Sequence, residues 1–210
     1  KNINKKRNFK FNKKIFYKNP IKITNNPKVD IVFELIGLPD GISKKIVVSS
    51  LKNKKHVITA NKALIAKNGD YLSLLAEKNK VNLEFEAAVG GGIPILRTLK
   101  DGLATNKISK VFGILNGTCN YILSKMESTK DSFYNVLKKA QLLGYAEPIN
   151  PKFDLNGLDT LAKVRILSAL AFNKKISKNK CLLNGIGDIE LEDIEIADKL
   201  NFKIKLLGIT

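Results

Sequence analysis

The order of apolar and polar positions divides the first part of the chain into short strands that alternate with helices. Residues 29–36 are largely apolar and end at Gly37, a pattern typical of a buried strand. Asn61 is a plausible N-cap for a later helix. Strands are predicted at 29–36, 56–59 and 81–85, and helices at 39–53 and 61–79, the second interrupted at Asn68 and Gly69. This alternation predicts a parallel α/β sheet.

The pattern changes at Glu86, where a glycine-rich loop begins that ends at Pro94. Helices are predicted at about 94–104, 118–126, 132–143, 157–172 and 192–200, and strands at 108–115, 181–186 and 202–209. This order indicates an α+β layer of helices over a sheet. We therefore expect two domains, an α/β parallel-sheet domain at 1–86 and an α+β domain at 87–210.

Composition limits the class of protein. Hydrophobic residues make up 44% of the 210 residues, enough to build a core. No apolar run reaches ~18 residues, so no membrane-spanning helix is expected, and no signal-peptide pattern is present. Cys119 and Cys181 lie far apart, which favours a reduced, cytoplasmic protein. His56 is the only histidine, so histidine metal sites and Ser-His triads have little support.

The net charge of +18 suggests nucleic-acid binding, but its distribution weakens that interpretation. Residues 1–28 hold ten basic residues and no acid, whereas charges of both signs are interspersed through the rest of the chain. No zinc knuckle or RNA-binding aromatic motif accompanies the charge. Nucleic acid is therefore not the expected partner, and a basic binding module built on residues 1–28 is kept only as a rival hypothesis.

Candidate chemistry gathers in the second half of the chain. Asp159 and Lys163 are four residues apart, so they share one helix face, and Glu147 lies in a loop just upstream. A lysine held beside carboxylates can donate a proton to a carbonyl oxygen. An ordinary surface ion pair is the alternative for Asp159 and Lys163. No GxGxxG fingerprint is present, so dinucleotide binding does not follow from that motif.

Six ordered motifs resemble those of homoserine dehydrogenases, and the resemblance covers nearly the whole chain from about residue 28. They are Phe33-Glu-Leu-Ile-Gly37, Lys55-His-Val-Ile-Thr-Ala-Asn61-Lys62, Phe85-Glu86-Ala-Ala-Val89-Gly-Gly91-Gly-Ile93-Pro94, Gly113-Ile-Leu-Asn116-Gly117-Thr118, Ala140-Gln-Leu-Leu-Gly144-Tyr-Ala-Glu147 and Phe153-Asp154-Leu-Asn-Gly157-Leu-Asp159-Thr-Leu-Ala-Lys163. The resemblance implies a partial Rossmann domain followed by a substrate-binding, catalytic and dimerisation domain.

The family interconverts aspartate 4-semialdehyde and homoserine in threonine, methionine and isoleucine synthesis. By resemblance, Lys163 is the proton donor. Glu147 and Asp159 match the carboxylates that bind the substrate, and Asp154 supports them. The resemblance implies an NADP- or NAD-dependent oxidoreductase that acts on a small molecule and forms a homodimer.

The resemblance also assigns cofactor-binding residues in both predicted domains. They are Ile36, Gly37, Lys62 and Gly144, and Lys1 aligns with a residue that can meet a 2′-phosphate. The alternatives are strand-end packing for Ile36 and Gly37 and a solvated side chain for Lys62. Asn116, Gly117 and Thr118 are expected to close the substrate domain over the nicotinamide, or only to form a strand-to-helix turn.

A monovalent cation such as sodium is a further implication of the resemblance. Its ligands would be Glu86, Val89, Gly91 and Ile93, mostly through backbone carbonyl oxygens, which suit hard cations. The alternative is a hinge whose glycines permit unusual backbone angles.

The resemblance implies an internal fragment or shortened form that lacks the family's first strand, Gly-rich turn and C-terminal end. On that basis we expect the 210-residue chain alone to be inactive or nearly so, because a Gly-rich turn and a helix N-terminus hold the pyrophosphate of a dinucleotide. A non-catalytic remnant of the enzyme is the second hypothesis for function.

Overall fold

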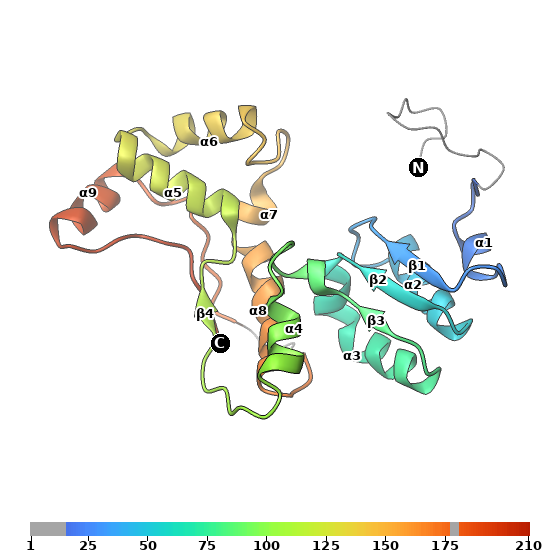
Figure 1. The fold of residues 1–210 in the computed structure, drawn as a ribbon. Coiled ribbons are helices and arrows are strands. Elements are labelled where there is room, and N and C mark those ends of the chain that lie inside the picture. Colours follow the sequence, from blue (N-terminus) through green and yellow to red (C-terminus); the bar gives the residue numbers. More distant parts are fainter. Residues whose placement is uncertain (1–15, 177–180) are drawn as a thin grey trace. The chain divides into compact units, whose positions relative to one another are not determined.

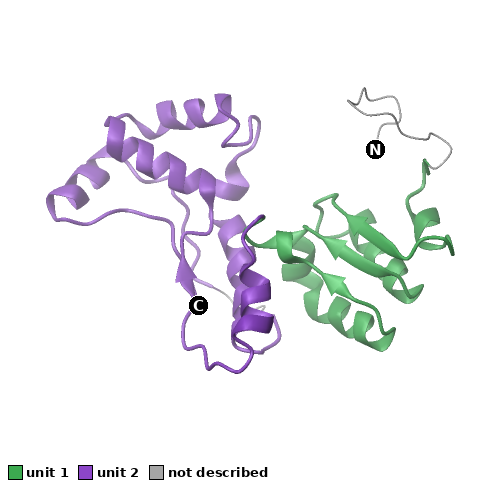
Figure 2. Cartoon of the chain, viewed as in Figure 1, with its two compact units in different colours: residues 1–91 green, residues 92–210 purple. Residues whose placement is uncertain are grey.

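The computed structural model describes residues 16–176 and 181–210, and the assignment of Lys1 to the cofactor lies outside them. The chain forms two compact units, residues 1–91 and residues 92–210 (Figure 2). This division lies five residues beyond the predicted change at 86. Within the described ranges, no helix is both long and apolar enough to cross a membrane.

Unit 1 is built on a parallel sheet in the order β1-β2-β3 (Figure 1). Strand β1 (Ile31–Glu34) pairs with β2 (His56–Thr59), which pairs with β3 (Leu83–Glu84). The connections are helices α2 (Ile42–Lys52) and α3 (Lys62–Lys78), while a short α1 (Ile21–Thr24) contacts α2 and a 3-10 turn, η2 (Glu86–Ala88), follows β3. The predicted parallel α/β arrangement is confirmed.

One face of this sheet carries the core of unit 1. Val32 and Glu34 of β1 are buried, whereas Ile31 and Phe33, which point to the opposite face, are exposed. Helices α2 and α3 supply buried apolar partners such as Val47, and sequential crossovers place both helices on the same side of a 1-2-3 sheet. Helix α3 runs unbroken through Gly69, which is buried, so the predicted interruption at Asn68 and Gly69 is wrong.

Unit 2 combines helices with a small antiparallel sheet. Its elements are α4 (Ile95–Arg97), the π-helical turn η3 (Thr98–Gly102), β4 (Phe112–Gly113), α5 (Gly117–Thr129), α6 (Phe133–Leu142), α7 (Lys152–Leu155), α8 (Leu158–Ala171), α9 (Leu191–Lys199) and β5 (Gly208–Ile209). Helix α5 is central, because α6, α7 and α9 all contact it. Its buried residues Cys119, Ile122, Leu123 and Met126 form the core with side chains from those neighbours. The predicted α+β class is confirmed.

The strands of unit 2 are shorter than predicted. Of the predicted strands at 108–115 and 202–209, only residues 112–113 and 208–209 pair with each other. The predicted strand at 181–186 is absent, because this segment packs its backbone against the turn between α7 and α8. The Ile186 amide donates to the Leu155 carbonyl (2.8 Å), and a Cβ atom added to Gly185 would lie 2.3 Å from the same oxygen.

Candidate functional site around Lys163

Helix α8 presents Asp159 and Lys163 on one face, as their spacing predicted. The Lys163 ammonium lies 2.7 Å from Asp159 Oδ2, and the two side chains are only 15% and 2% exposed. The ammonium also donates to the Leu115 carbonyl oxygen at 2.5 Å. Within the described ranges, 16–176 and 181–210, the third N–H of Lys163 meets no acceptor, so it is available to a bound molecule.

A second layer of the site comes from the turn that precedes α5. Asn116 is the N-cap of α5, where its Oδ1 accepts from the Cys119 amide at 2.8 Å. Its Nδ2 donates to Asp154 Oδ1 (2.8 Å) and to Asp159 Oδ2 (2.9 Å). The sequence analysis missed this role of Asn116, although an Asn at a predicted helix start was a usable signal.

Glu147 lies in the exposed loop between α6 and α7. Its backbone carbonyl accepts from Gln141 Nε2 (3.1 Å), and the neighbouring Tyr145 carbonyl accepts from Thr118 Oγ1 (2.6 Å). Tyr145 also stacks on Tyr121 of α5 with ring centroids 4.5 Å apart. Among the described residues, no hydrogen bond or ion pair reaches the Glu147 carboxylate. The structure therefore brings Asp154, Asp159 and Lys163 together and leaves Glu147 on an anchored loop.

The pKa of the Cys119 thiol is affected by burial and by the charged residues of this site. It is buried and donates to the Asp154 carbonyl oxygen at 3.3 Å. Burial raises its pKa to about 12, and the charges of Asp154 and Asp159 add to the rise, while Lys163 opposes it. The thiol therefore stays protonated at neutral pH and cannot act as a nucleophile there.

In unit 1, the proposed cofactor residues lie where β1 and β2 end. Ile36 and Gly37 follow β1, and Lys62 begins α3 directly after β2. Adjacent parallel strands end at the same edge of a sheet, the edge where ligands of open α/β sheets bind. Gly37 has φ of 90°, a left-handed conformation that favours glycine. Gly144, with φ of 77°, follows α6 in unit 2 and terminates that helix.

A buried carboxylate that the sequence analysis did not single out connects these two strand ends. Glu34 is 1% exposed and accepts from the Ile36 amide (2.8 Å), the Thr59 hydroxyl (2.9 Å) and Asn61 Nδ2 (3.2 Å). Asn61 Nδ2 also donates to the Leu38 carbonyl (2.7 Å). These bonds fix the loop after β1 relative to the start of α3. Lys62 directly follows Asn61, so the same bonds fix the position of its backbone.

The four candidate cation ligands lie in one short segment, residues 86–93. The Glu86 carbonyl accepts from the Val89 amide (3.3 Å), and the Ile93 carbonyl accepts from the Ile95 amide (2.8 Å). Gly90 and Gly92 have φ of 64° and 85°, so the loop needs glycine at both positions. A carbonyl oxygen has two lone pairs, so these bonds leave room for a cation. Across the described residues, no group of three His, Cys, Asp or Glu side chains is arranged as a metal site.

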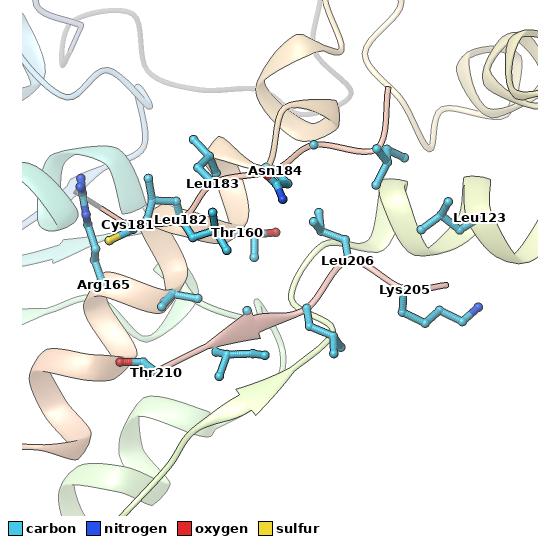
Figure 3. A pocket seen from close by; sticks show the side chains of 18 of the residues that line it. Leu123, Thr160, Arg165, Cys181, Leu182, Leu183, Asn184, Lys205, Leu206 and Thr210 are labelled. Atoms are coloured by element: carbon cyan, nitrogen blue, oxygen red, sulfur yellow. The ribbon is translucent and has the colours of Figure 1, made fainter. Parts of the chain in front are cut away.

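The large cavity of unit 2 does not contain the predicted site. It measures about 620 Å³ and is lined by α8, residues 181–186 and residues 204–210 (Figure 3). Thr160 and Val164 of α8 line it, whereas Asp159 and Lys163 do not. Asp159 and Lys163 instead contact the turn before α5, so the chemistry and the cavity involve different faces of one helix.

Comparison with known proteins agrees with this geometry. Residues 94–210 match the family model described as homoserine dehydrogenase, and residues 1–86 match the model described as homoserine dehydrogenase, NAD binding domain. Homoserine dehydrogenase from Neisseria gonorrhoeae is 47% identical over 93% of this chain and 44% of its own length. The Bacillus subtilis enzyme is 42% identical over 100% of this chain and 48% of its own length.

A solved structure of a homoserine dehydrogenase also matches this chain. The crystal structure of a homoserine dehydrogenase from Thiobacillus denitrificans matches with a TM-score of 0.88 and 44% identity over 91% of this chain and 44% of that chain. The chain thus spans about half the length of the relatives it matches. Two family models, one for each unit, together with a solved relative of the same fold, show that this chain belongs to the homoserine dehydrogenase family.

Proposed function

We propose that the protein interconverts L-aspartate 4-semialdehyde and L-homoserine, with Lys163 as the proton donor. The observation that carries the proposal is the Lys163 ammonium, held at 2.7 Å by Asp159 and at 2.5 Å by the Leu115 carbonyl. Two of its N–H groups are fixed by these partners, and the third faces no acceptor among the described residues. Family membership supports the enzyme over the non-catalytic remnant.

The proposed reaction needs one hydride and one proton for each aldehyde reduced. A reduced nicotinamide cofactor, NADPH or NADH, would supply the hydride to the carbonyl carbon and would itself become NADP+ or NAD+. The carbonyl oxygen then takes its proton from Lys163 Nζ, and solvent restores that proton to the amine. Asp159 stays beside the ammonium at 2.7 Å and fixes its position for the transfer. In the reverse direction the same lysine, as the neutral amine, accepts the proton of the homoserine hydroxyl.

Substrate binding is assigned to carboxylates, because homoserine and the semialdehyde both carry an ammonium group. Asp154 is half-buried on α7, Asp159 is buried on α8, and Glu147 is exposed on the loop that Gln141 and Thr118 anchor. A charge-assisted hydrogen bond from the ligand ammonium suits such acceptors. We assign the exposed Glu147 carboxylate to the same ligand ammonium.

The cofactor is assigned to Ile36, Gly37 and Lys62 in unit 1 and to Gly144 in unit 2. The match of residues 1–86 to an NAD-binding domain supports a nicotinamide dinucleotide, either NADP or NAD. The positions of Ile36, Gly37 and Lys62 after parallel strands support a cofactor at that edge. We further assign the carbonyl groups of Glu86, Val89, Gly91 and Ile93 to a monovalent cation, tested by comparing turnover in sodium and in tetramethylammonium chloride.

The small sheet of unit 2 is proposed as the dimer contact. Phe112 of β4 and Ile209 of β5 are directly opposite each other, on the same face, and are 68% and 55% exposed. The other face carries Gly208, which packs so closely on Val164 of α8 that an added Cβ would lie 2.5 Å from it. An exposed apolar face of this kind fits the same face of a second copy.

We place the reaction in the cytoplasm, within threonine, methionine and isoleucine synthesis. The cysteines support a reducing compartment, because Cys119 is buried as a free thiol in the core of unit 2 and Cys181 is an exposed free thiol. In an oxidising compartment the exposed thiol of Cys181 would be prone to oxidation.

The proposal is tested by titrating L-homoserine and NADP into a chimera in which residues 92–210 replace the corresponding segment of the Neisseria gonorrhoeae relative. Glu147→Gln and Asp159→Asn are expected to weaken homoserine binding more than NADP binding, because each removes a negative charge that faces the ligand ammonium. Asp131→Asn is the matched control, since Asp131 lies at the start of α6 and pairs with Lys139. Equal losses for homoserine and NADP in the two site variants would indicate general collapse of the loop and count against the assignment.

A further inference from the structure

We propose that Asn116 is a positioning residue of this site, whose amide holds Asp154 and Asp159 in the arrangement that places the Lys163 ammonium. The inference deepens the proposed function and rests on it. Its basis is a single buried side chain, 4% exposed, that makes three hydrogen bonds of 2.8, 2.8 and 2.9 Å. These bonds use both N–H donors of the amide and one lone pair of its oxygen.

The backbone fixes which end of the amide faces the carboxylates. The Cys119 amide N–H at the start of α5 needs an acceptor, and Asn116 Oδ1 provides it. The NH₂ group must then point toward Asp154 and Asp159. A reversed amide would put its oxygen against two carboxylates and its donors against a donor. The helix cap therefore determines the orientation of the donors that serve the site.

The two carboxylates need such a bridge because both lie within hydrogen-bond distance of one amide nitrogen. Lys163 contacts Asp159 Oδ2 directly, and that same oxygen accepts from Asn116. Asp154 Oδ1 accepts from the other N–H of Asn116. Charge-assisted bonds to both acids offset their mutual repulsion and fix the rotation of the Asp159 carboxylate. Since Asp159 and the Leu115 carbonyl set the position of the ammonium, Asn116 acts on Lys163 through Asp159.

Asn116 acts on the reaction through these neighbours, since both of its N–H donors are occupied by Asp154 and Asp159 and its oxygen already caps α5. The consequence is a test on Lys163 itself, which does not require turnover. When the bridge is removed, Asp159 rotates, the ammonium loses its fixed partner, and Lys163 reacts faster with an amine reagent. The factor is expected to be about tenfold, the equivalent of one hydrogen bond to a charged group.

The experiment compares Asn116→Ser with wild type by reductive methylation of the native chain, with the rate at Lys163 read by mass spectrometry. Serine keeps a good N-cap acceptor but cannot reach the carboxylates. The control is Ser132→Ala, which removes the cap of α6, where Ser132 Oγ accepts from the Asn135 amide. Faster methylation of Lys163 in Asn116→Ser alone is the expected result. Equal rates in Asn116→Ser and wild type would overturn the proposal.

A second measurement covers the case in which Asn116→Ser loosens the whole unit. Methylation of Lys139, which is held by Asp131 on α6, reports such loosening in the same spectrum. Acceleration at Lys163 with an unchanged rate at Lys139 supports positioning, and equal acceleration at both contradicts it. The outcome does not depend on catalysis: a chimera that binds no homoserine would refute the proposed function and leave the labelling result to decide the role of Asn116.

Discussion

Burial distinguishes the Asp159–Lys163 pair from exposed ion pairs such as Asp131–Lys139. Asp131 and Lys139 lie 2.8 Å apart, but the lysine is 61% exposed, whereas Lys163 is only 15% exposed. Exposed pairs contribute little to stability and are common. A buried pair with a further carbonyl acceptor holds its lysine in one place, which suits a proton donor better than a solvated surface pair.

The Cys119 thiol gives a prediction at the residue scale. Its pKa of about 12 in the folded state lies above the value of an unfolded thiol, ~8.5. Between these values the unfolded chain binds fewer protons than the folded chain, so stability falls as pH rises. We expect the urea midpoint to fall more from pH 8 to pH 10 in wild type than in Cys119→Ala. Cys181→Ala should behave like wild type. The same fall of the urea midpoint with pH in wild type, Cys119→Ala and Cys181→Ala would contradict a buried thiol at Cys119.

Sequence predicted the Asp159–Lys163 contact because the two residues are neighbours on one helix. It could not predict the partners that make the contact specific. Leu115 lies 48 residues before Lys163, and Asn116 lies 43 residues before Asp159. The Glu34 network likewise joins residues 25 and 27 positions apart. Such contacts depend on how α5 and α8, or β1 and β2, meet in space, and local patterns carry no information on that.

At the scale of elements, the cap predicted at Asn61 is confirmed, and two further side-chain caps were not predicted. Asn61 caps α3, Asn116 caps α5, and Ser132 caps α6 through side-chain acceptors. Strands were less predictable because a strand requires a partner as well as an alternating pattern. Residues 181–186 were predicted as a strand, but their backbone packs against the α7–α8 turn and pairs with no other strand among the described residues. The short helix α7 was missed, since four residues are too few for a periodic pattern.

An ion network provides a prediction for α5 and α9. Lys203 binds Glu127 of α5 and Asp198 of α9, and its hydrogen bonds lower the pKa of both carboxyl groups. Carboxylates with lowered pKa stabilise the folded state above their unfolded values, and this contribution is lost as pH falls through the folded pKa. Lys203→Gln should therefore lower the thermal midpoint at pH 7 and low salt.

The difference between Lys203→Gln and wild type should shrink below pH ~4, where the carboxylates become protonated, and at high salt, which screens exposed charges. Lys199→Gln, at the end of α9, serves as the control for loss of one positive charge. A difference that persists unchanged at pH 3 would exclude the ion network as its cause.

At the scale of the whole molecule, the chain has two units, each with its own buried core. Unit 1 supplies strand ends suited to a dinucleotide, and unit 2 supplies the acids and the lysine. The alternation of strands and helices allowed the α/β class of unit 1 to be predicted from sequence. Helical periodicity likewise predicted most helices of unit 2. The small sheet of unit 2 was overestimated, because its described pairing is limited to two residues on each strand.

The exposed face of that sheet gives a prediction about assembly. If Phe112 and Ile209 meet a second copy, Phe112→Lys should convert a dimer to a monomer, because an unpaired charge cannot be buried there without cost. Light scattering after size-exclusion chromatography measures the mass. Tyr134→Lys, on α6, is the control, since Tyr134 is 62% exposed. A wild-type chain that is monomeric across the accessible concentrations would rule out this contact.

The most direct test of the account is whether Lys163 carries proton transfer. Residues 92–210 would replace the corresponding segment of the Neisseria gonorrhoeae relative, and homoserine-dependent reduction of NADP and NAD would be measured for the chimera, its Lys163→Ala variant and a Lys139→Ala control. Loss of a positioned acid is expected to reduce turnover by ~100-fold or more. Homoserine and cofactor binding should persist, and Lys139→Ala should match the parent. Near-normal turnover by a folded Lys163→Ala chimera would contradict the account.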